Sequence, residues 1–309
     1  MSPRASTGAA WDCVVVGGGP AGLSAAVYMG RFLRRTLVVD DEQGRWTYGQ
    51  TNDNYLGFPN GVSARRLQSL GSAQARRFGV SFRKATVTQV NAEDGRFRLD
   101  TTRGVLVART VIWAAGVQDI WPECDSARTL VGKRMYWCIV CDGWRTLDRS
   151  VLLLGDTEAA ARTALQFLTY TSRLTFLVDA RSSRLTGRAR ARLASEGIAV
   201  RTGCLRKARE RDGAVEVTFD DGSRERIDYI FSLLGSRPRT AGLEALKLRR
   251  SQKGNVATDD KGRTNVPGFL AAGDVTDRHA HQVASAVHEG AEAAQAANSL
   301  LYPPRQRMK

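Results

Sequence analysis

The segment from Trp11 to Gly22 constrains the fold of this 309-residue chain more than any other. Its first part, Trp11 to Val16, is an apolar run typical of a buried parallel strand. The run leads directly into a turn in which Gly17, Gly19 and Gly22 fit the pattern GxGxxG. In such a turn the first glycine allows a tight bend, the second lets a pyrophosphate approach the backbone, and the third lets the next helix pack on the strand.

The residues after this turn complete a strand–helix–strand unit. A helix is predicted from Ala21 to Phe32, and its first backbone amides can bind phosphate groups. The next predicted strand, Thr36 to Val39, ends at Asp40. An acidic residue about 20 positions after the glycines is where a ribose hydroxyl is bound in dinucleotide sites. A glycine turn alone is a weak signal, but the strand, helix and acid together predict a dinucleotide-binding unit.

The remainder of the first half fits the same kind of fold. A loop-like stretch, 45–62, is followed by a predicted helix over 64–78. A strand over 110–113 then closes on the small residues Ala115 and Gly116. A strand that ends on small residues lets the backbone pass close to a bound cofactor.

The second half repeats the plan. A predicted strand over 151–154 is followed by a helix over 158–170, and a later strand covers 229–234. A last apolar strand over 269–274 and an Ala-rich helix over 281–301 close the pattern. We therefore predict an α/β fold with two Rossmann-like, three-layer ββα nucleotide-binding domains.

A cysteine pair, Cys138 and Cys141, lies between the two predicted units and is followed by Asp142. Two thiols at this spacing can close a disulfide and reopen it, and the first is usually the attacking thiolate. An adjacent carboxyl can hold or release a proton during that cycle. A lone CxxC can also be half of a zinc site or a chance occurrence. A structural zinc site needs four N or S ligands, and the chain has no second CxxC and only three histidines, all near its C-terminus. No metal site is predicted.

The composition limits which kinds of partner and which cellular location can be expected. The net charge of +15 would attract acidic proteins or nucleic acid. The basic residues are scattered without interleaved aromatics, so no dedicated nucleic-acid site is expected. No stretch approaches the ~20 apolar residues of a membrane span, and the first ten residues lack the apolar core of a secretory signal. A cytoplasmic location is the resulting expectation.

These motifs resemble those of the low-molecular-weight thioredoxin reductases over nearly the whole chain. The segments that carry the resemblance are GGGPAG at 17–22, CIVCDG at 138–143 and AAGDV at 271–275, with weaker matches NYLG at 54–57 and GSRP at 235–238. The resemblance implies an FAD-binding domain made of residues 1–116 and 241–309. A NAD(P)-binding-like domain, residues 117–240, would be inserted into it and carry the CxxC.

The resemblance also implies a homodimeric FAD enzyme whose partner is a thioredoxin-like protein or a small disulfide or dithiol. Its glycine turn would hold the pyrophosphate and Asp40 the adenosine ribose. Asn54 would lie beside the flavin, and Gly273-Asp274 would contact the ribityl-phosphate part. The implied cofactor-binding positions are Gly17, Gly19, Pro20, Ala21, Gly22, Asp40, Gln50, Asn54, Ala115, Gly116, Gly273, Asp274, His281, Gln282 and Val283. The family's Arg-Gln-Ala near the flavin is His281-Gln282-Val283 here, so only the glutamine is kept.

For the dithiol the resemblance implies a division of roles. Cys141 would face the flavin, Cys138 would exchange with the partner disulfide, and Asp142 would act as the acid/base. A simple turn residue before Gly143 is the alternative interpretation of Asp142.

The second nucleotide site departs from the family pattern. Where the family has Gly-x-Gly-x-x-Ala, this chain has Gly155-Asp156-Thr157-Glu158-Ala159-Ala160. A threonine replaces the glycine that must admit the pyrophosphate, and two carboxylates are added where two phosphates would bind. The family's basic stretch for a 2′-phosphate is replaced by Val178-Asp179-Ala180, although Arg181 is nearby. The sequence therefore disfavours an NADPH site.

Four functions remain open from the sequence. The favoured hypothesis is a thioredoxin-reductase-like enzyme that receives electrons from an acidic ferredoxin-type protein. The alternatives are an O₂-dependent dithiol oxidase acting on a small molecule, an ordinary NADPH-dependent thioredoxin reductase, and a flavin-binding redox sensor without turnover. For Tyr302 in the C-terminal tail, a frayed end is favoured over a contact with a neighbouring subunit's flavin, and for His288-Glu289 a solvent-facing helix pair is expected.

Overall fold

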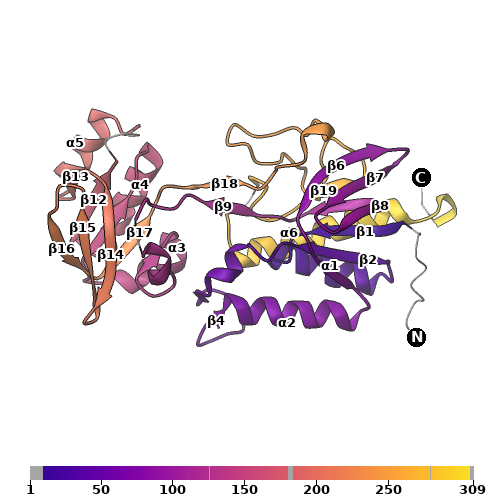
Figure 1. Ribbon diagram of the computed structural model, residues 1–309, viewed down its shortest axis with the longest axis horizontal. Coiled ribbons are helices and arrows are strands. Elements are labelled where there is room, and N and C mark those ends of the chain that lie inside the picture. The colour runs from indigo at the N-terminus through magenta and orange to yellow at the C-terminus, as the bar shows by residue number, and fades with distance from the viewer. Residues whose placement is uncertain (1–9, 125, 180–183, 279, 307–309) are drawn as a thin grey trace. The chain divides into compact units, whose positions relative to one another are not determined.

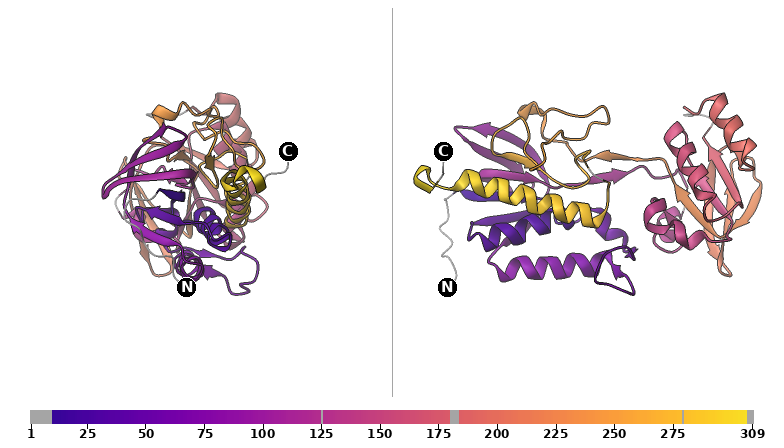
Figure 2. Two further views of the ribbon diagram at one scale, coloured as in Figure 1. Left: turned by 90° about the vertical axis from the view of Figure 1, so that its right-hand side faces the viewer. Right: turned by 180° about the vertical axis from the view of Figure 1, so that it is seen from behind.

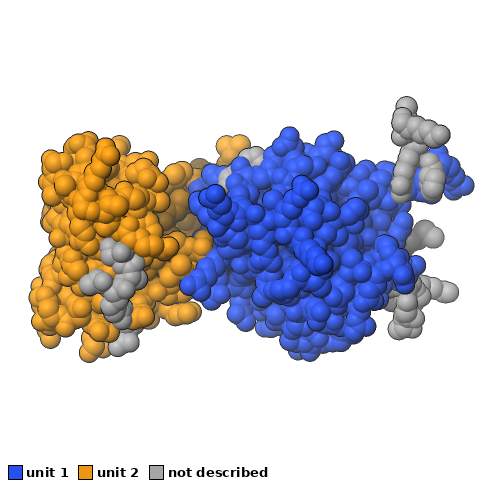
Figure 3. Space-filling model, turned by 90° about the horizontal axis from the view of Figure 1, so that it is seen from above, with its two compact units in different colours: residues 1–47, 62–118, 237–309 blue, residues 48–61, 119–236 orange. Residues whose placement is uncertain are grey.

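The computed structural model describes residues 10–124, 126–179, 184–278 and 280–306. They form two compact units, which Figure 3 shows in two colours. Unit 1 comprises the chain up to residue 47, residues 62–118 and the chain from 237, and unit 2 comprises residues 48–61 and 119–236. The expected boundaries after residues 116 and 240 differ from these by a few positions. Residues 48–61, expected in the first domain, group with unit 2 instead.

Unit 1 is built on a seven-stranded sheet with the order β5-β2-β1-β8-β7-β6, in which β19 also pairs with β8 (Figure 1). Strands β5, β2, β1, β8 and β19 run parallel, and β6 and β7 add an antiparallel hairpin. The strands of this sheet are β1 (Trp11–Val16), β2 (Thr36–Asp40), β5 (Ser81–Lys84), β6 (Val87–Glu93), β7 (Arg96–Thr101), β8 (Gly104–Trp113) and β19 (Phe269–Ala271), and the short β4 (Val62–Ser63) lies outside it.

The central strand β1 is buried on both faces, which explains its unbroken apolar sequence. Cys13 and Val15 pack with the helices on one face, and Val14 and Val16 pack on the other against the β6–β7–β8 side and residues 243–256. The helices are α1 (Pro20–Arg31), α2 (Ala64–Arg77) and α6 (Val283–Leu301), with short 3₁₀ turns η1 (Arg45–Tyr48), η4 (Glu244–Leu246) and η5 (Pro304–Gln306).

Helices α1 and α6 lie side by side on one face of this sheet (Figure 2). Small residues make the close approach possible. A Cβ added to Gly290 of α6 would lie 2.1 Å from the carbonyl oxygen of Ala21 in α1. Ala293, Ala294 and Ala297 on the same helix are fully buried. The Ala-rich composition of the C-terminal helix is therefore a packing requirement.

Unit 2 has a parallel sheet of order β10-β17-β11-β12-β13 and a separate antiparallel sheet β14-β15-β16. Leu153 of the parallel sheet packs with the helices, and Leu152 packs on the opposite face with the antiparallel sheet. The strands are β3 (Thr51–Asn52), β10 (Met135–Tyr136), β11 (Val151–Leu154), β12 (Leu174–Val178), β13 (Ala199–Thr202), β14 (Leu205–Arg211), β15 (Ala214–Phe219), β16 (Arg224–Ile227) and β17 (Tyr229–Ser232). The helices are α3 (Ile139–Asp142), α4 (Glu158–Phe167) and α5 (Gly187–Ser195), with 3₁₀ turns η2 (Ala127–Leu130) and η3 (Gly143–Thr146).

Each unit thus has a three-layer arrangement of helices, parallel sheet and antiparallel strands, and the predicted fold class is confirmed. The chain changes unit four times, and the passages at 118–119 and 236–237 run through β9 (Val117–Asp119) and β18 (Ser236–Pro238), which pair with each other. No helix among the described residues is both long and apolar enough to cross a membrane.

Two helices end or begin a few residues from the predicted positions, for local reasons. Helix α4 stops at Phe167 because the amides of residues 168–170 bond to carbonyls three residues back, in tighter turns. Helix α6 begins at Val283 because Gln282 is its N-cap, and the Gln282 and Ser285 side chains form a reciprocal capping box.

Candidate functional site

The two cysteines of the CxxC motif are joined by a disulfide in unit 2. Their Cα atoms are 5.3 Å apart, within the usual range for a disulfide. Cys138 is the N-cap of the single-turn helix α3, and its Sγ accepts the backbone N–H of Cys141 at 3.1 Å. Both residues are only partly buried. The pair can therefore open and close within one turn of chain, as the redox interpretation requires.

Asp142 lies at the end of the same turn and is buried, with 8% of its surface exposed. Burial raises the pKa of its carboxyl to about 6, although the hydrogen bond from Arg145 opposes the shift. The Nε of Arg145 lies 3.1 Å from Asp142 Oδ1. A carboxyl with this pKa can carry or release a proton near neutral pH, which suits the predicted acid/base role better than that of a turn residue.

Aromatic residues surround the start of the redox turn. Trp137, next to Cys138, packs its ring against Tyr48 and Trp121 at centroid distances of 5.5 and 5.1 Å. Tyr48 also meets Trp121 edge-on. These contacts explain why residues 48–61 group with unit 2, since Tyr48 begins that segment. They also hold the segment with the expected cofactor positions Gln50 and Asn54.

The glycine turn of unit 1 has the geometry that the sequence predicts. Gly17 has a φ of +110°, and an added Cβ would lie 2.2 Å from the carbonyl oxygen of Ala114. A Cβ on Gly22 would lie 1.9 Å from the Gly17 carbonyl oxygen, so the helix packs on the strand only because Gly22 has no side chain. A Cβ on Gly19 would meet nothing within 4 Å. The open space beside Gly19 is where the pyrophosphate is expected.

The start of α1 is also free to bind an anion. Its N-cap is Gly19, no side chain caps it, and Pro20 is its first residue, followed by the buried Ala21. The amides of the first turn are otherwise left without intrahelical partners. The residues present therefore fit the phosphates of a dinucleotide such as FAD.

The neighbouring strand ends complete the edge of the sheet next to this turn. Asp40 lies against the turn, because a Cβ on Gly18 would be 2.6 Å from Asp40 Oδ2. Burial raises the pKa of Asp40, partly offset by a hydrogen bond from the Gly18 backbone. Ala115 and Gly116 follow β8, and Gly116 has a φ of +67° and accepts the amide of Arg239 at 3.0 Å.

A third segment of unit 1 brings the Gly-Asp motif to the same helix layer. Gly273 has a φ of +78°, and its added Cβ would lie 2.9 Å from Cβ of Ala21 in the first turn of α1. Asp274 forms an ion pair with Arg45 at 2.8 Å. The Gly-Asp motif, predicted to contact the ribityl-phosphate part of FAD, thus reaches the start of α1.

The segment before α6 holds the remaining expected positions. His281 places its Nε2 3.4 Å from the carbonyl oxygen of Thr276. Gln282 caps α6, and Val283 is the first residue of that helix. Of the expected cofactor positions, only Gln50 and Asn54 lie in unit 2. The Oε1 of Gln50 is buried with no hydrogen-bond partner among the described residues, and a bound polar group would satisfy it.

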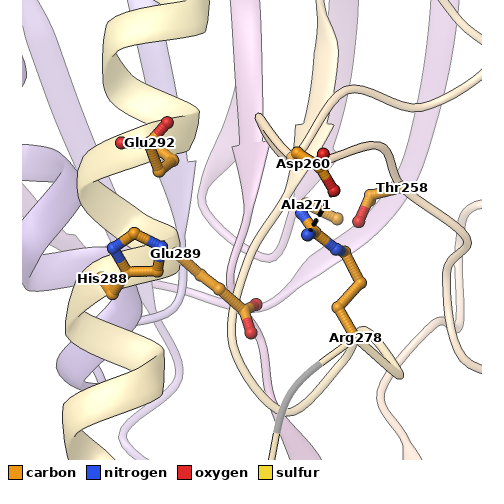
Figure 4. Close-up of a pocket in the computed structure, with 8 residues that line it drawn as sticks. Thr258, Asp260, Ala271, Arg278, His288, Glu289 and Glu292 are labelled. Carbon is orange, nitrogen blue, oxygen red and sulfur yellow. Dashed lines mark hydrogen bonds and ion pairs between the residues drawn. The ribbon is translucent and has the colours of Figure 1, made fainter.

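Glu289 is a residue whose role the sequence prediction missed. The expected solvent-facing position is wrong, because Glu289 is 8% exposed. Its Oε2 accepts the amide of Gly273 at 2.7 Å and the hydroxyl of Thr276 at 3.0 Å. Figure 4 shows Glu289 projecting from α6 beside a polar hollow near Arg278, which forms an ion pair with Asp260. The hollow has room for about one water molecule, so it is not a cofactor site. Glu289 instead fixes the turn that carries Gly273.

The corresponding position of the second nucleotide fold carries a side-chain cap. Thr157 is the N-cap of α4, and its Oγ1 accepts the amide of Ala160 at 3.2 Å. Glu158 Oε1 accepts both the hydroxyl and the amide of Thr186, at 2.6 and 3.2 Å. Asp156 is 8% exposed and lies 3.9 Å from Arg184. Among the first amides of α4, that of Ala160 is thus already bonded to a side chain of the same protein.

Asp179 and Arg181 are the two residues that the sequence places near the position of a 2′-phosphate. Asp179 is partly buried at the end of β12. Arg181 lies outside the described residues. Tyr302, in the tail, packs in its own unit: its hydroxyl accepts Nδ2 of Asn298 at 3.1 Å, and Arg34 lies over its ring.

Comparisons with known proteins agree with this geometry. The family model described as pyridine nucleotide-disulphide oxidoreductase matches residues 11–290. A thioredoxin reductase of Treponema pallidum (strain Nichols) is 29% identical over 301 residues, which covers 94% of this chain and 97% of that protein. The solved structure of HlmI matches with a TM-score of 0.84 and 28% identity, covering 97% of this chain and 95% of HlmI.

A second solved structure shares more sequence. The atypical thioredoxin reductase TRi from Desulfovibrio vulgaris Hildenborough is 34% identical, with a TM-score of 0.52 and coverage of 94% of this chain and 97% of TRi. The chain therefore belongs to the pyridine nucleotide-disulphide oxidoreductase family, as an FAD-binding disulfide oxidoreductase of the low-molecular-weight thioredoxin-reductase type.

Proposed function

We propose that this enzyme exchanges electrons between FAD and the Cys138–Cys141 pair without using NADPH, and that a ferredoxin-type protein is its donor. The observation that supports the proposal is the closed N-terminus of α4. In a nucleotide fold of this kind the pyrophosphate binds the first amides of that helix. Thr157 already caps the Ala160 amide, and its side chain takes the place of the glycine that would let the phosphates approach.

Charge adds to this obstruction. Asp156 and Glu158 flank the cap in the sequence, and each adds a negative charge next to the position expected for the phosphates of an incoming dinucleotide. Each close like-charge pair costs on the order of 1 kcal/mol even in water. Glu158 is also tied to Thr186 at the start of α5, so relieving the repulsion would break two hydrogen bonds. A dinucleotide would have to overcome both effects.

The chemistry of the dithiol follows from its own residues. FAD, when bound, supplies two-electron redox chemistry to the pair. In the reducing direction the Cys138 thiolate attacks one sulfur of a partner disulfide, the partner's S–S bond breaks, and a mixed disulfide forms. Cys141 then attacks the Sγ of Cys138, which closes the intramolecular disulfide and releases the partner as a dithiol. The two protons of the reduced pair end on the partner's sulfurs, and Asp142 transfers one of them.

The proposed partners follow from charge and from the relatives. A net charge of +15 favours encounter with acidic proteins such as ferredoxins. A relative that shares 34% identity is named an atypical thioredoxin reductase, which supports a thioredoxin-like protein as the electron acceptor. We propose that the chain acts as a homodimer, as the family resemblance implies.

The direct test is an anaerobic titration of the purified flavoprotein with NADPH, NADH and reduced ferredoxin in turn. We expect the flavin absorbance to bleach within seconds with ferredoxin and not with either nicotinamide. Bleaching by NADPH on that timescale would contradict the proposal and establish an ordinary thioredoxin reductase.

Two further arms of the same experiment separate the other functions. Oxygen consumption driven by small dithiols would identify a dithiol oxidase, in which electrons run from the dithiol through the flavin to O₂. A flavin that no donor reduces, with no turnover of any disulfide, would identify a redox sensor.

A further inference from the structure

Arg145 joins the redox turn to the segment with the expected cofactor positions Gln50 and Asn54. Its Nε hydrogen-bonds Asp142 Oδ1 at 3.1 Å, and its Nη2 forms an ion pair with Asp53. All of these groups lie in unit 2. One guanidinium therefore connects the carboxyl beside Cys141 to the segment 48–61.

We infer that Arg145 is a positioning residue that orients the Asp142 carboxyl and, through Asp53, couples that carboxyl to the segment 48–61. The inference rests on the proposed function of the Cys138–Cys141 pair in thiol–disulfide exchange. It assigns roles to Arg145 and Asp53, which no motif in the sequence marks.

The surroundings of Arg145 leave its guanidinium little freedom. It lies 5.5 Å from the ring centroid of Tyr136 and 4.6 Å from that of Trp144. The Arg145 side chain is 23% exposed, and those of Asp53 and Asp142 are 27% and 12% exposed. A planar guanidinium packed on aromatic rings can bind two carboxylates in fixed directions. A lysine at this position would carry its charge on a single ammonium group and could not bind two carboxylates in fixed directions.

Two charged neighbours shift the pKa of the Asp142 carboxyl in opposite directions. Arg145 lowers the pKa of the Asp142 carboxyl, and the negative charge of Asp53 raises it. The phenol of Tyr136 also faces this cluster, and burial raises its pKa to about 12, so it stays neutral during turnover. Of these groups, Arg145 and Asp53 are the two whose removal should shift Asp142, and with opposite signs.

This opposition has a consequence for the exchange reaction. When Cys138 attacks a partner disulfide, the leaving sulfur carries negative charge and takes up a proton. Asp142 can give that proton only while it is protonated and correctly oriented. The hydrogen bond from Arg145 sets the orientation, and the balance of Arg145 and Asp53 sets the pH range over which the proton is held.

The test uses holoprotein reduced by dithiothreitol, freed of the reductant under anaerobic conditions, and mixed with a small aliphatic disulfide, whose leaving thiolate takes up a proton, from pH 4.5 to 9. The variants are Arg145→Met, Arg145→Lys and Asp53→Asn. Arg149→Met is the matched control, because Arg149 is an exposed arginine four positions away. We expect the inflection assigned to Asp142 to move up by about one pH unit in Arg145→Met and down in Asp53→Asn. Arg145→Lys should restore part of the shift, and Arg149→Met should match the wild type.

Two results would overturn the inference. One is an unchanged inflection in Arg145→Met when its flavin content and urea midpoint equal those of the wild type. The other is a shift of the same sign in Arg145→Met and Asp53→Asn, which a general loosening of the turn would produce. If Arg145→Met does not fold, the Asp53→Asn shift alone decides, because an upward or absent shift contradicts the assignment.

The result is independent of the electron donor, because the dithiol is reduced chemically. Alkylation of the reduced pair by iodoacetamide across the same pH range provides a second readout without any disulfide substrate. A protein reduced by NADPH would refute the proposed function and leave these pH shifts in place. A pair that alkylates with the expected shifts but exchanges with no disulfide would refute the exchange function alone.

Discussion

The first helix of each nucleotide fold starts in a different way, although the strands and helices around the two starts follow the same order. Helix α1 has a glycine N-cap with no side-chain cap, and the space beside Gly19 is open. Helix α4 has Thr157 as its N-cap, and the hydroxyl of that residue accepts the Ala160 amide. The same order of strands and helices thus carries an open helix start at α1 and, at α4, a start closed by the Thr157 side chain.

The N-termini of α1 and α4 also differ in how the N-cap residue stabilises the helix. A threonine N-cap stabilises a helix by about 1 kcal/mol relative to alanine. A glycine N-cap is nearly as stabilising as a threonine N-cap, and at α1 it leaves the first amides for a ligand. A cofactor that binds only the folded protein adds stability by mass action. In unit 2 the Thr157 side chain caps α4 without a ligand.

Closing the open start should have the largest effect. The change Gly19→Thr places a capping hydroxyl where the pyrophosphate is expected, and the Cβ itself meets nothing within 4 Å. Losing two charge-assisted hydrogen bonds, at about 1.5 kcal/mol each, should lower FAD affinity by about 100-fold. Flavin fluorescence during titration of apoprotein measures this. The matched control is Gly187→Thr, at the other unit's helix α5, where the added Cβ also meets nothing. Full FAD affinity in Gly19→Thr would show that the two starts do not differ in function.

Opening the closed start should have a smaller effect. In the double variant Thr157→Gly, Glu158→Ala, the Ala160 amide is freed and one carboxylate is removed from the phosphate position. Two gains of about 1 kcal/mol each should raise NADPH affinity roughly 10- to 30-fold. Calorimetric titration measures the gain. Glu216→Ala on β15 removes a charge from the same unit at a distance and should change nothing. If the double variant binds NADPH no better, the closed start is not what excludes the nucleotide.

The uncapped N-terminus of α1 could be predicted from the sequence, because the residues that indicate it lie close together along the chain. The apolar run, the three glycines and the acid after the next strand each have a steric or polar reason that acts within about 30 residues. The closed start was visible as well, since Thr157 replaces an expected glycine. The sequence did not show that Glu158 accepts a hydrogen bond from Thr186. These residues are 28 positions apart and come together only when unit 2 folds.

The other residues that the sequence analysis missed have partners that are far away along the chain. The burial of Glu289 could not be inferred from an alternation of residues on one helix, since its partner Gly273 lies in a separate loop. Likewise, Asp53 and Arg145 are 92 positions apart. A carboxylate that seems suited to solvent in the sequence can be buried when the fold supplies backbone amides to it. These are the residues that position the expected site without belonging to any motif.

Removing the cap alone should have a modest effect on stability. The change Thr157→Ala leaves the Ala160 amide without its side-chain acceptor, and should lower the free energy of unfolding by about 1 kcal/mol. Urea denaturation followed by circular dichroism measures the difference. The control Thr163→Ala lies within the same helix, where alanine is the better helix former, so it should be neutral or stabilising by a few tenths of a kcal/mol. Equal losses in both variants would mean that the hydroxyl of Thr157 does not act as a cap.

The smallest expected effect is a pH dependence at the closed start. The hydrogen bonds from the Thr186 hydroxyl and amide lower the pKa of Glu158 in the folded state. A carboxyl with a lowered folded pKa stabilises the protein above its unfolded pKa, and this stabilisation is lost as the pH falls through the folded pKa. The variant Glu158→Gln should therefore be slightly less stable than the wild type at pH 7, with the difference shrinking as the pH falls below the ordinary glutamate pKa of about 4.3 and lost once the pH is below the lowered folded pKa. Urea midpoints from pH 3 to 7 measure this, with Glu93→Gln on the exposed hairpin of unit 1 as the control. A difference that persists unchanged to pH 3 would show that the carboxylate charge does not hold α4 and α5 together. In that case Thr157 alone would close the second site.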